Sequence, residues 1–255
     1  MSPFQKQSSL IIGRQPILEA LKEGNQLERI FLQKNTIGDI IGEIKKYAAE
    51  LQVPINVVPG EKLNSLSRSN HQGVIAIRSF IKYLELQDVI DLCTSKGETP
   101  LFLMLDSVTD VRNIGGIARS AVVCGAQAIV IPDRGVGALN EEAVKASAGA
   151  LEKIHVCRVT SLLKAVDTLH MNGFKIFSSE LEAPVKVYEA DFTEPSCIIV
   201  GNEEKGIQPY LTKASDVRFT IPMKGKFDSL NVSVATGIIL FEALKQRSKN
   251  DVHSS

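Results

Sequence analysis

Short apolar runs alternate with amphipathic stretches along most of this chain. In its C-terminal part, uninterrupted apolar runs predict six strands, and residues with helical spacing separate these runs. The predicted strands cover residues 101–105, 128–131, 154–159, 174–178, 197–200 and 217–221. Continuous apolar strands joined by helical crossovers are typical of a parallel sheet that is covered on both faces. We therefore predict an α/β fold whose ligands bind at the carboxyl ends of the strands.

Residues 26–77 carry a smaller pattern of the same kind, with apolar runs around a helical stretch from Ile40 to Leu51. The polar stretch 95–100, which ends in a proline, is the clearest break. The predicted division is an N-terminal α/β domain over 1–80, a linker over 81–100, a second domain over 101–247 and a flexible tail over 248–255.

The last predicted helix, about residues 230–246, is apolar on much of its circumference. A helix of this kind buries more than one face. We therefore expect it to pack against a partner surface as well as against its own sheet.

Composition narrows the class of protein. Hydrophobic residues make up 44% of the chain and charged residues 23%, and no apolar run approaches the roughly 18 residues of a membrane span. The N-terminus has no apolar leader with a cleavage site, so we expect a cytoplasmic protein. The cysteines and histidines are scattered, which favours reduced core thiols and no metal site. They are Cys93, Cys124, Cys157, Cys197, His71, His155, His170 and His253.

Charge gives only weak support to a nucleic-acid partner. The formal net charge is zero, whereas phosphate binding normally leaves a basic footprint. Residues 1–82 do hold 11 Lys and Arg against 7 Asp and Glu, and the remainder holds 18 against 22. A basic N-terminal module that captures RNA fits this asymmetry, which is too small to decide the question.

Three polar, glycine-bearing loops, over 105–120, 198–207 and 221–237, follow predicted strands. In the first, Asn113 stands where a helix would be capped, and Arg119 follows six residues later. In the second, glycines around Glu203 permit close backbone approach to a ligand and leave a carboxylate available to it. In the third, Ser229, Asn231 and Ser233 lead into a helix.

Taken singly, each loop also has a purely structural interpretation. The first fits a capped helix with a surface arginine, the second a plain strand-to-helix turn, and the third an N-cap cluster. No G-x-G-x-x-G or G-K-[ST] sequence occurs, which disfavours NAD and ATP binding, and no local signature of a histidine triad is present. These residues alone indicate an α/β enzyme with an unknown ligand.

Taken together, in this order and spacing, the loops resemble the three motifs of the SpoU (TrmH-type) RNA 2′-O-ribose methyltransferases of the SPOUT superfamily. The matching stretches are Asn113 to Arg119, Gly201 to Gly206, and Ile221 to Ser233. The resemblance covers about 101–247. Residues 8–80, with their Ile-Gly-Arg and His-Gln-Gly sequences, resemble the L30e-like substrate-binding domain of the family.

This resemblance implies a mostly parallel sheet with a trefoil knot, which general topology rules would have dismissed. It also implies a homodimer and S-adenosylmethionine as the cofactor. The residues that it places at the cofactor are Gly201, Ile221 and Leu230.

The catalytic residues that the resemblance implies are Arg119, Asn113, Glu203, Ser229 and Asn231. A guanidinium with a pKa above about 12 gives up a proton reluctantly. We therefore expect Arg119 to hold the target phosphate and stabilise alkoxide charge rather than to act as the base. The other four would orient the ribose, the arginine and the cofactor.

The expected partner is RNA rather than DNA or a membrane. The separate N-terminal domain favours a guanosine of large-subunit (23S) ribosomal RNA, as in the two-domain bacterial members of the family. The same reaction on tRNA is the first alternative. A non-catalytic RNA-binding or ribosome-assembly factor is an alternative of another class, and the intact set of polar residues disfavours it. A dinucleotide oxidoreductase is disfavoured by the missing glycine fingerprint.

Overall fold

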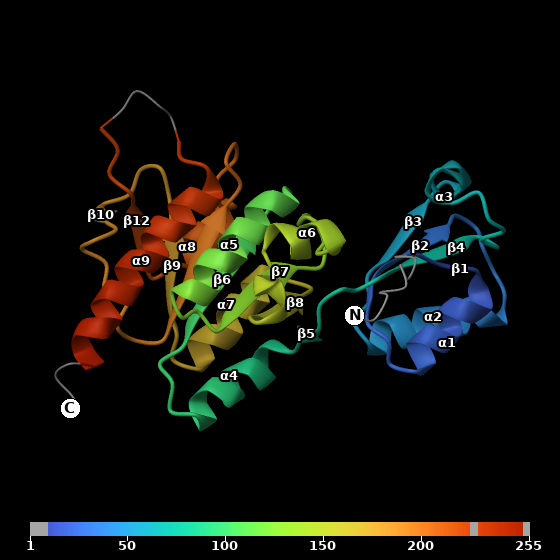
Figure 1. Ribbon diagram of the computed structural model, residues 1–255, viewed down its shortest axis with the longest axis horizontal. Helices are drawn as coiled ribbons and strands as arrows, with labels where there is room; N and C mark the ends of the chain where they lie inside the picture. Colours follow the sequence, from blue (N-terminus) through green and yellow to red (C-terminus); the bar gives the residue numbers. More distant parts are fainter. Residues whose placement is uncertain (1–9, 225–228, 252–255) are drawn as a thin grey trace, which may run out of the picture. The chain divides into compact units, whose positions relative to one another are not determined.

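A computed structural model describes residues 10–224 and 229–251, with side chains up to Ser248. Residues 225–228 of the third loop and the end of the predicted tail, 252–255, lie outside the described residues. The chain forms two compact units, divided between Ile81 and Lys82 (Figure 1).

The N-terminal unit is a small α/β sheet of order β1-β4-β2-β3, in which β2 and β3 are parallel and the other pairs antiparallel. Apolar residues of two helices, among them Ile17, Leu21, Ile41 and Ile44, form its core with the sheet. Its elements are β1 (Leu10–Ile12), α1 (Arg14–Lys22), β2 (Leu27–Gln33), α2 (Asp39–Glu50), β3 (Ile55–Val58), α3 (Gly60–Leu66) and β4 (Val74–Arg78).

The C-terminal unit holds a sheet of order β10-β12-β9-β11-β6-β7-β8-β5, with every described pairing parallel. Its strands are β5 (Tyr83–Leu84), β6 (Leu101–Asp106), β7 (Ala128–Pro132), β8 (His155–Val159), β9 (Lys175–Ser179), β10 (Val185–Lys186), β11 (Ser196–Gly201) and β12 (Val217–Thr220). Its helices are α4 (Leu86–Ser95), α5 (Val111–Val123), α6 (Glu141–Ala146), the 3-10 turn Ala150–Glu152, α7 (Leu162–Met171), α8 (Pro209–Ala214) and α9 (Val232–Asp251). The six predicted strands and the α/β class are confirmed.

Helices cover both faces of this sheet (Figure 1). Phe102 and Met104 of β6 belong to a core cluster with residues of α4, α7 and α8. Because side chains alternate along a strand, the residues of β6 next to Phe102 and Met104 point to the opposite face of the sheet, on the side of α5 and α9. Phe177 of β9, Phe219 of β12 and Phe192, which lies in the segment before β11, form an aromatic cluster. Their ring centroids are 4.7–6.5 Å apart. The continuous apolar runs are thus explained by burial on two sides.

The linker predicted over 81–100 is largely absent, because most of this stretch belongs to the second unit. Strand β5 pairs with β8, and α4 buries Leu86, Val89, Ile90 and Cys93 in the core. Their helical spacing is itself an amphipathic signal, which the polar break after the helix obscured. At the other end, α9 continues to Asp251 and includes the first residues of the predicted tail.

Arg247 ties α9 to the sheet. Burial lowers the pKa of its guanidinium to about 10, which still leaves it charged at neutral pH. Its nitrogens donate to the backbone carbonyls of Thr99, Pro100, Phe192 and Glu194. Since Pro100 and Glu194 lie just before β6 and β11, the helix is fixed against the two strands that end at the candidate site.

Three of the four cysteines are buried and all four are free thiols, as predicted for core residues; Cys124 is half-buried. Burial raises the pKa of Cys157 to about 12, which keeps this thiol protonated and unreactive. Within the described residues, no helix is both long and apolar enough to cross a membrane. The described part of the chain also holds no group of three His, Cys, Asp or Glu residues suited to a metal ion.

Candidate functional site

The first two predicted loops leave the sheet side by side. Strands β6 and β11 are parallel neighbours, and their last residues, Asp106 and Gly201, lie opposite each other in register. After Gly201 the chain turns back on itself through a bridge between Asn202 and Gly206. The position of the site therefore follows from the sheet order, since loops after adjacent parallel strands emerge at one edge.

Glycine is required at position 201 because the backbone of Gly206 and Ile207 returns very close to it. A Cβ at this position would overlap the carbonyl of Gly206 and the amide nitrogen of Ile207. Any side chain here would push the returning segment away, so glycine is the residue that the fold accepts.

Glu203 is the point where three distant segments meet. Its Oε1 accepts hydrogen bonds from Asn113 Nδ2 at 2.9 Å, Asn231 Nδ2 at 2.7 Å and the backbone N–H of Val232 at 3.3 Å. Asn231 Nδ2 also donates to Asn113 Oδ1 at 2.9 Å. The cluster joins the start of α5, the loop after β11 and the start of α9, and it fixes the position of the carboxylate.

Asn231 uses its side-chain oxygen to cap α9 and its side-chain nitrogen to bond within the cluster. Its Oδ1 accepts from the Ser233 amide at 3.0 Å and the Val234 amide at 3.4 Å, which caps α9. Its Nδ2 reaches Glu203. The positive N-terminal end of α9 favours the carboxylate beside it. The N-cap interpretation is therefore correct for this residue, and the same side chain also hydrogen-bonds to Glu203.

Asn113 is not a helix cap, contrary to the sequence prediction. Asp110 caps α5, and its side chain accepts from the Arg112 amide at 2.8 Å. Asn113 lies in the first turn and is buried. Asp110 and Asn113 are both residue types that can cap a helix. Asp110 caps α5, whereas Asn113 points into the protein and donates to Glu203.

A cavity of about 430 Å³ opens beside this cluster. Gly201, Ile221 and Leu230 all line it, and so do Glu203 and Ser229. Asn113 and Asn231 are connected to the cavity through Glu203. The volume lies within the range of small-molecule and cofactor sites.

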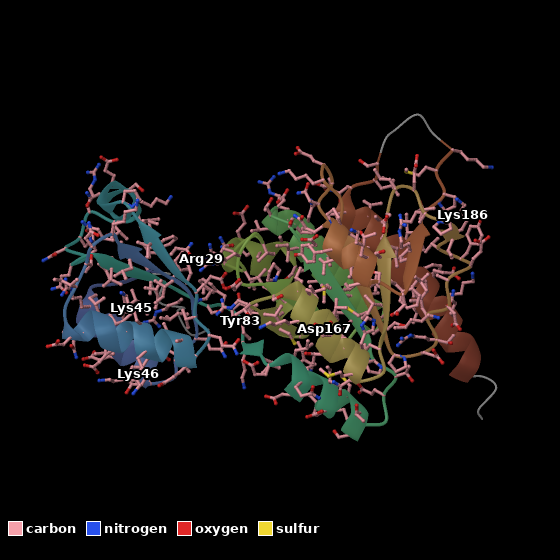
Figure 2. The ribbon with its side chains drawn as sticks, turned by 180° about the vertical axis from the view of Figure 1, so that it is seen from behind. Arg29, Lys45, Lys46, Tyr83, Asp167 and Lys186 are labelled. Carbon is pink, nitrogen blue, oxygen red and sulfur yellow. The ribbon has the colours of Figure 1, made fainter. Side chains whose placement is uncertain are left out.

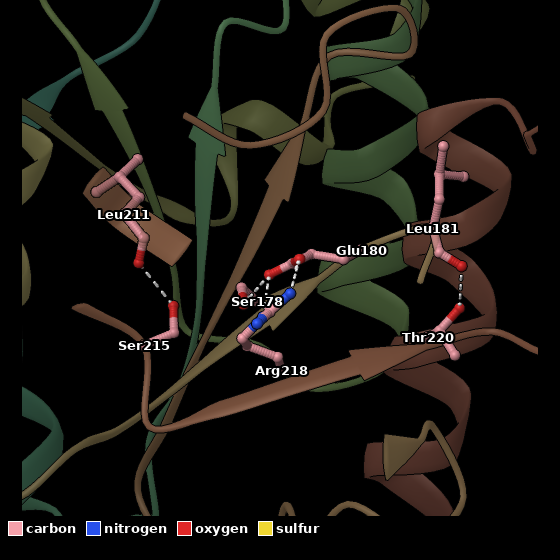
Figure 3. Close-up of polar contacts among 7 residues, drawn as sticks. All are labelled: Ser178, Glu180, Leu181, Leu211, Ser215, Arg218 and Thr220. Atoms are coloured by element: carbon pink, nitrogen blue, oxygen red, sulfur yellow. Dashed lines mark hydrogen bonds and ion pairs between the residues drawn. The ribbon is translucent and has the colours of Figure 1, made fainter. Parts of the chain in front are cut away.

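Another wall of the cavity comes from the residues that end and follow β9, which the sequence prediction missed. Figure 3 shows the polar contacts of this segment with β12. Glu180 lines the cavity and accepts from Arg218 Nε at 3.2 Å and Nη2 at 3.0 Å. This carboxylate raises the pKa of Arg218 by hydrogen bonding and charge attraction. Ser178 Oγ also donates to Glu180, and Thr220 Oγ1 donates to the Leu181 carbonyl. The position of Glu180 just after a predicted strand was the available signal.

Asp106 was also missed as a positioning residue. It is almost fully buried at the end of β6. Its Oδ2 accepts from the Gln208 amide at 2.6 Å, and its Oδ1 accepts from Ser107 Oγ at 2.9 Å. The carboxylate thereby fastens the loop after β11 to the loop after β6.

Arg119 stands apart from the other predicted residues. It is exposed on α5 and does not line the cavity of its own chain. Four residues later, on the same helix face, Val123 is 78% exposed. One subunit therefore brings Asn113, Glu203 and Asn231 together beside the cavity but leaves Arg119 outside it.

Two family models together match most of the chain. Residues 100–241 match the SpoU rRNA methylase family, and residues 10–84 match the RNA 2′-O ribose methyltransferase substrate-binding domain. The chain belongs to the SpoU methylase family. The resemblance of the three motifs is thus confirmed. This SpoU-family chain is 32% identical over 245 residues to YacO of Bacillus subtilis (strain 168), a protein assigned to the TrmH family of tRNA/rRNA methyltransferases. The alignment covers 96% of this chain and 98% of YacO.

Solved structures agree with the fold. The SpoU methyltransferase AviRb from Streptomyces viridochromogenes, in complex with AdoMet, has a TM-score of 0.61 and 22% identity, and covers 94% of this SpoU-family chain and 90% of its own. An RNA 2′-O ribose methyltransferase has a TM-score of 0.55 and 26% identity, with 94% and 88% covered. Both comparisons include the two units of the chain.

Proposed function

We propose that this chain transfers a methyl group from S-adenosylmethionine to the 2′-oxygen of a ribose in RNA. The observation that carries the proposal is the convergence of the three motif segments at one cavity. Glu203 lines that cavity and is bonded to Asn113 from the first segment and Asn231 from the third. Convergence of this kind is expected of a reaction centre and is not needed for a turn or a helix cap.

The cavity suits the proposed cofactor in size and in charge. Apolar side chains such as Val200, Ile207 and Leu230 offer a surface for an adenine ring. Among the described lining residues, Glu182, Glu203 and Glu204 carry carboxylates and Lys205 is the one lysine, while Glu180 is paired with Arg218. This excess of negative charge favours a ligand with cationic groups. S-adenosylmethionine, whose sulfonium and ammonium groups are positive, supplies the activated methyl group when bound.

The residues of the chain then align the reactants and handle charge. Three N–H donors hold one oxygen of the Glu203 carboxylate. Glu203 lines the cavity, and there its carboxylate can orient a ribose hydroxyl or a guanidinium. Ser229 lines the same cavity and offers a hydroxyl. We assign Arg119 to the target phosphate and to the developing alkoxide, because a guanidinium is a persistent cation and a poor base.

For the substrate we propose a guanosine of 23S ribosomal RNA, with tRNA as the second candidate. The separate N-terminal unit, which matches a substrate-binding model, supports a large structured RNA. The relative YacO is named for both tRNA and rRNA. The hydrogen-bonded cluster around Glu203 argues against the alternative of a non-catalytic RNA-binding or ribosome-assembly factor. An RNA substrate is consistent with the expected cytoplasmic location.

Two measurements test this function. Calorimetry of the full chain should detect binding of S-adenosylmethionine, and mapping of 2′-O-methyl groups should find one ribosomal position lost in a deletion strain and restored by the intact gene. A methyl group lost from tRNA instead would select the second substrate. Identical methylation maps in the parent and deletion strains, together with no cofactor binding, would contradict the proposal.

We further propose a homodimer in which the partner subunit's Arg119 reaches the cavity. On α9, Val234, Ile238 and Phe241 are exposed at spacings of four and three residues, which makes one apolar face. Exposed apolar residues arranged in this way mark an interface. Helix α5, which carries Arg119 and Val123, packs against α9, so the same interface would bring the arginine to a second subunit.

Phe241→Asp is expected to convert the dimer to a monomer and to abolish methylation, because a carboxylate replaces an apolar side chain that is 63% exposed in one subunit. Sedimentation velocity measures the association. Met171→Asp, on α7, is the matched control, since Met171 is 80% exposed and lies on the other face of the sheet. An unchanged sedimentation coefficient for the Phe241 variant would exclude this interface.

We also propose that the passage around Gly201 is part of the trefoil knot implied by the family. The segment 202–206 folds back closely over Gly201. The start of α9 returns from more than twenty residues further along the chain to bond with Glu203. Both segments thus return to the end of β11, where the family resemblance places the knot.

A further inference from the structure

Lys205 lies in the second motif segment, and the reaction proposed above gives it no role. It is exposed, and it is the one cationic side chain in the described lining of the C-terminal cavity. Its ammonium group forms no ion pair with a residue of the described ranges 10–224 and 229–248. An accessible cation in an otherwise acidic cavity therefore needs a separate explanation.

The backbone that carries Lys205 is held at several points. Asn202 Oδ1 accepts from the Glu204 amide at 2.9 Å and from the Lys205 amide at 3.3 Å. Asn202 Nδ2 donates to the Ser107 carbonyl at 3.2 Å, which links this loop to the loop after β6. The Gly206 amide donates to the Asn202 carbonyl at 2.8 Å. The base of the lysine side chain is thus fixed before a ligand enters, which lowers the entropy lost on binding.

The cavity lining around Lys205 combines both charge signs with apolar groups. Glu203 and Glu204 directly precede the lysine, and Glu182 adds a carboxylate from the segment after β9. Val200 and Ile207, just before and just after the same loop, are apolar and buried. A ligand that complements this lining has an apolar part, cationic groups and an anionic group.

We propose that Lys205 binds the α-carboxylate of S-adenosylmethionine and so recognises the amino-acid end of the cofactor. The inference rests on the proposed function, since it takes this cofactor to occupy the cavity. S-adenosylmethionine carries a sulfonium, an ammonium and one carboxylate, and a lining with several carboxylates and one lysine matches this set of charges. Because a short carbon chain joins the carboxylate to the sulfonium, a methyl group presented beside Glu203 leaves the carboxylate within reach of the same loop.

A phosphate of the RNA is the other anion that a lysine at this position can meet. The carboxylates beside Lys205 favour the cofactor, because they attract its ammonium and sulfonium groups and repel the polyanionic backbone of RNA. The two ligands are distinguished by which affinity the lysine controls.

The test compares two ligands by calorimetry on the full chain. S-adenosylhomocysteine carries the carboxylate, and its decarboxylated analogue lacks only that group. Lys205→Ala removes the proposed contact, and Lys205→Arg keeps the positive charge. Lys213→Ala is the charge-matched control, since Lys213 is exposed on α8 and does not line the cavity. Anisotropy of a fluorescent hairpin RNA gives the affinity for RNA.

We expect Lys205→Ala to bind S-adenosylhomocysteine about five- to tenfold more weakly than the wild type, because a hydrogen bond between charged groups is lost at an exposed site. The affinity for the decarboxylated analogue should stay the same. Lys205→Arg should retain most of the affinity for S-adenosylhomocysteine, and Lys213→Ala should retain all of it. In methylation assays Lys205→Ala should raise the KM for S-adenosylmethionine more than it lowers kcat, since the carboxylate is bound equally before and during methyl transfer.

Wild-type affinity for S-adenosylhomocysteine in Lys205→Ala would overturn this inference and leave the proposed function standing. Equal losses for the two ligands would also overturn it, because the lysine would then act without the carboxylate. A loss confined to the affinity for RNA would assign Lys205 to a phosphate and overturn the inference in the same way. Failure of the wild-type chain to bind either ligand would count against the proposed function itself.

Discussion

Arg119→Ala is expected to lower the rate of methyl transfer about 10²–10³-fold, the usual effect of removing one donor that stabilises developing negative charge. Because Arg119 is assigned to the target phosphate and the developing alkoxide rather than to the cofactor, the affinity for S-adenosylmethionine should not change. The rate of the Arg119→Lys protein should lie between those of the wild-type and Arg119→Ala proteins, because lysine keeps the charge but lacks the planar guanidinium with its paired donors. Single-turnover methylation of the mapped RNA, together with cofactor calorimetry, measures both quantities.

Arg112→Ala is the control for this experiment. Arg112 lies seven residues earlier on the same face of α5, and its described ion pair is an exposed one with Glu142 at 3.8 Å. Its loss should change the rate by less than about twofold, since exposed pairs contribute little. A wild-type rate in the Arg119→Ala protein would remove this arginine from the reaction.

Mixing subunits tests where Arg119 acts. If the arginine serves the partner's cavity, mixed dimers of Arg119→Ala and Glu203→Ala chains contain one complete site each, and random pairing should restore about a quarter of wild-type activity. Co-expression of the two chains with different tags allows the mixed dimer to be purified. No recovery in that dimer would show that Arg119 acts within its own subunit.

Glu203→Ala is expected to lower methylation at least about 100-fold, because it removes the group that orders the site. The amides of Asn113 and Asn231 and the Val232 N–H lose their common acceptor. Asn113 is buried, so its donor is not easily hydrated. Because Glu203 itself is exposed and water can enter, the free energy of unfolding should fall by only about 1–2 kcal/mol. Methylation kinetics and denaturant unfolding give the two values.

Asp167→Ala removes a carboxylate from an exposed position on α7 and should change neither quantity (Figure 2). Glu203→Gln tests the effect of the negative charge alone, because the glutamine side chain has nearly the same shape and its amide oxygen still accepts hydrogen bonds. It should retain the wild-type stability and lose most of the rate. Full activity in Glu203→Ala would mean that the convergence of the three segments has no part in the reaction.

Much of the candidate site could be predicted because its residues follow strands. Gly201 and Glu203 come directly after a continuous apolar run, and the carboxyl ends of parallel strands meet at one edge. The same rule would have indicated Glu180 after β9, which lines the cavity. The pairing of Asn113 with Glu203 could not be predicted, because it depends on β6 and β11 being neighbours although ninety residues separate the two partners.

By itself, the sequence determined the main strands of the C-terminal sheet and the class of fold. Burial on both faces makes a parallel strand apolar throughout, and a helix shows its buried stripe at a period of 3.6 residues, so both patterns are local and readable. Only the tertiary structure decided that α4 belongs to the second unit, that Asp110 rather than Asn113 caps α5, and that Arg119 does not line the cavity of its own chain. These outcomes depend on contacts between residues far apart in the chain. Local propensity does not encode such contacts, because a polar residue can satisfy its hydrogen bonds either at a cap or across the fold.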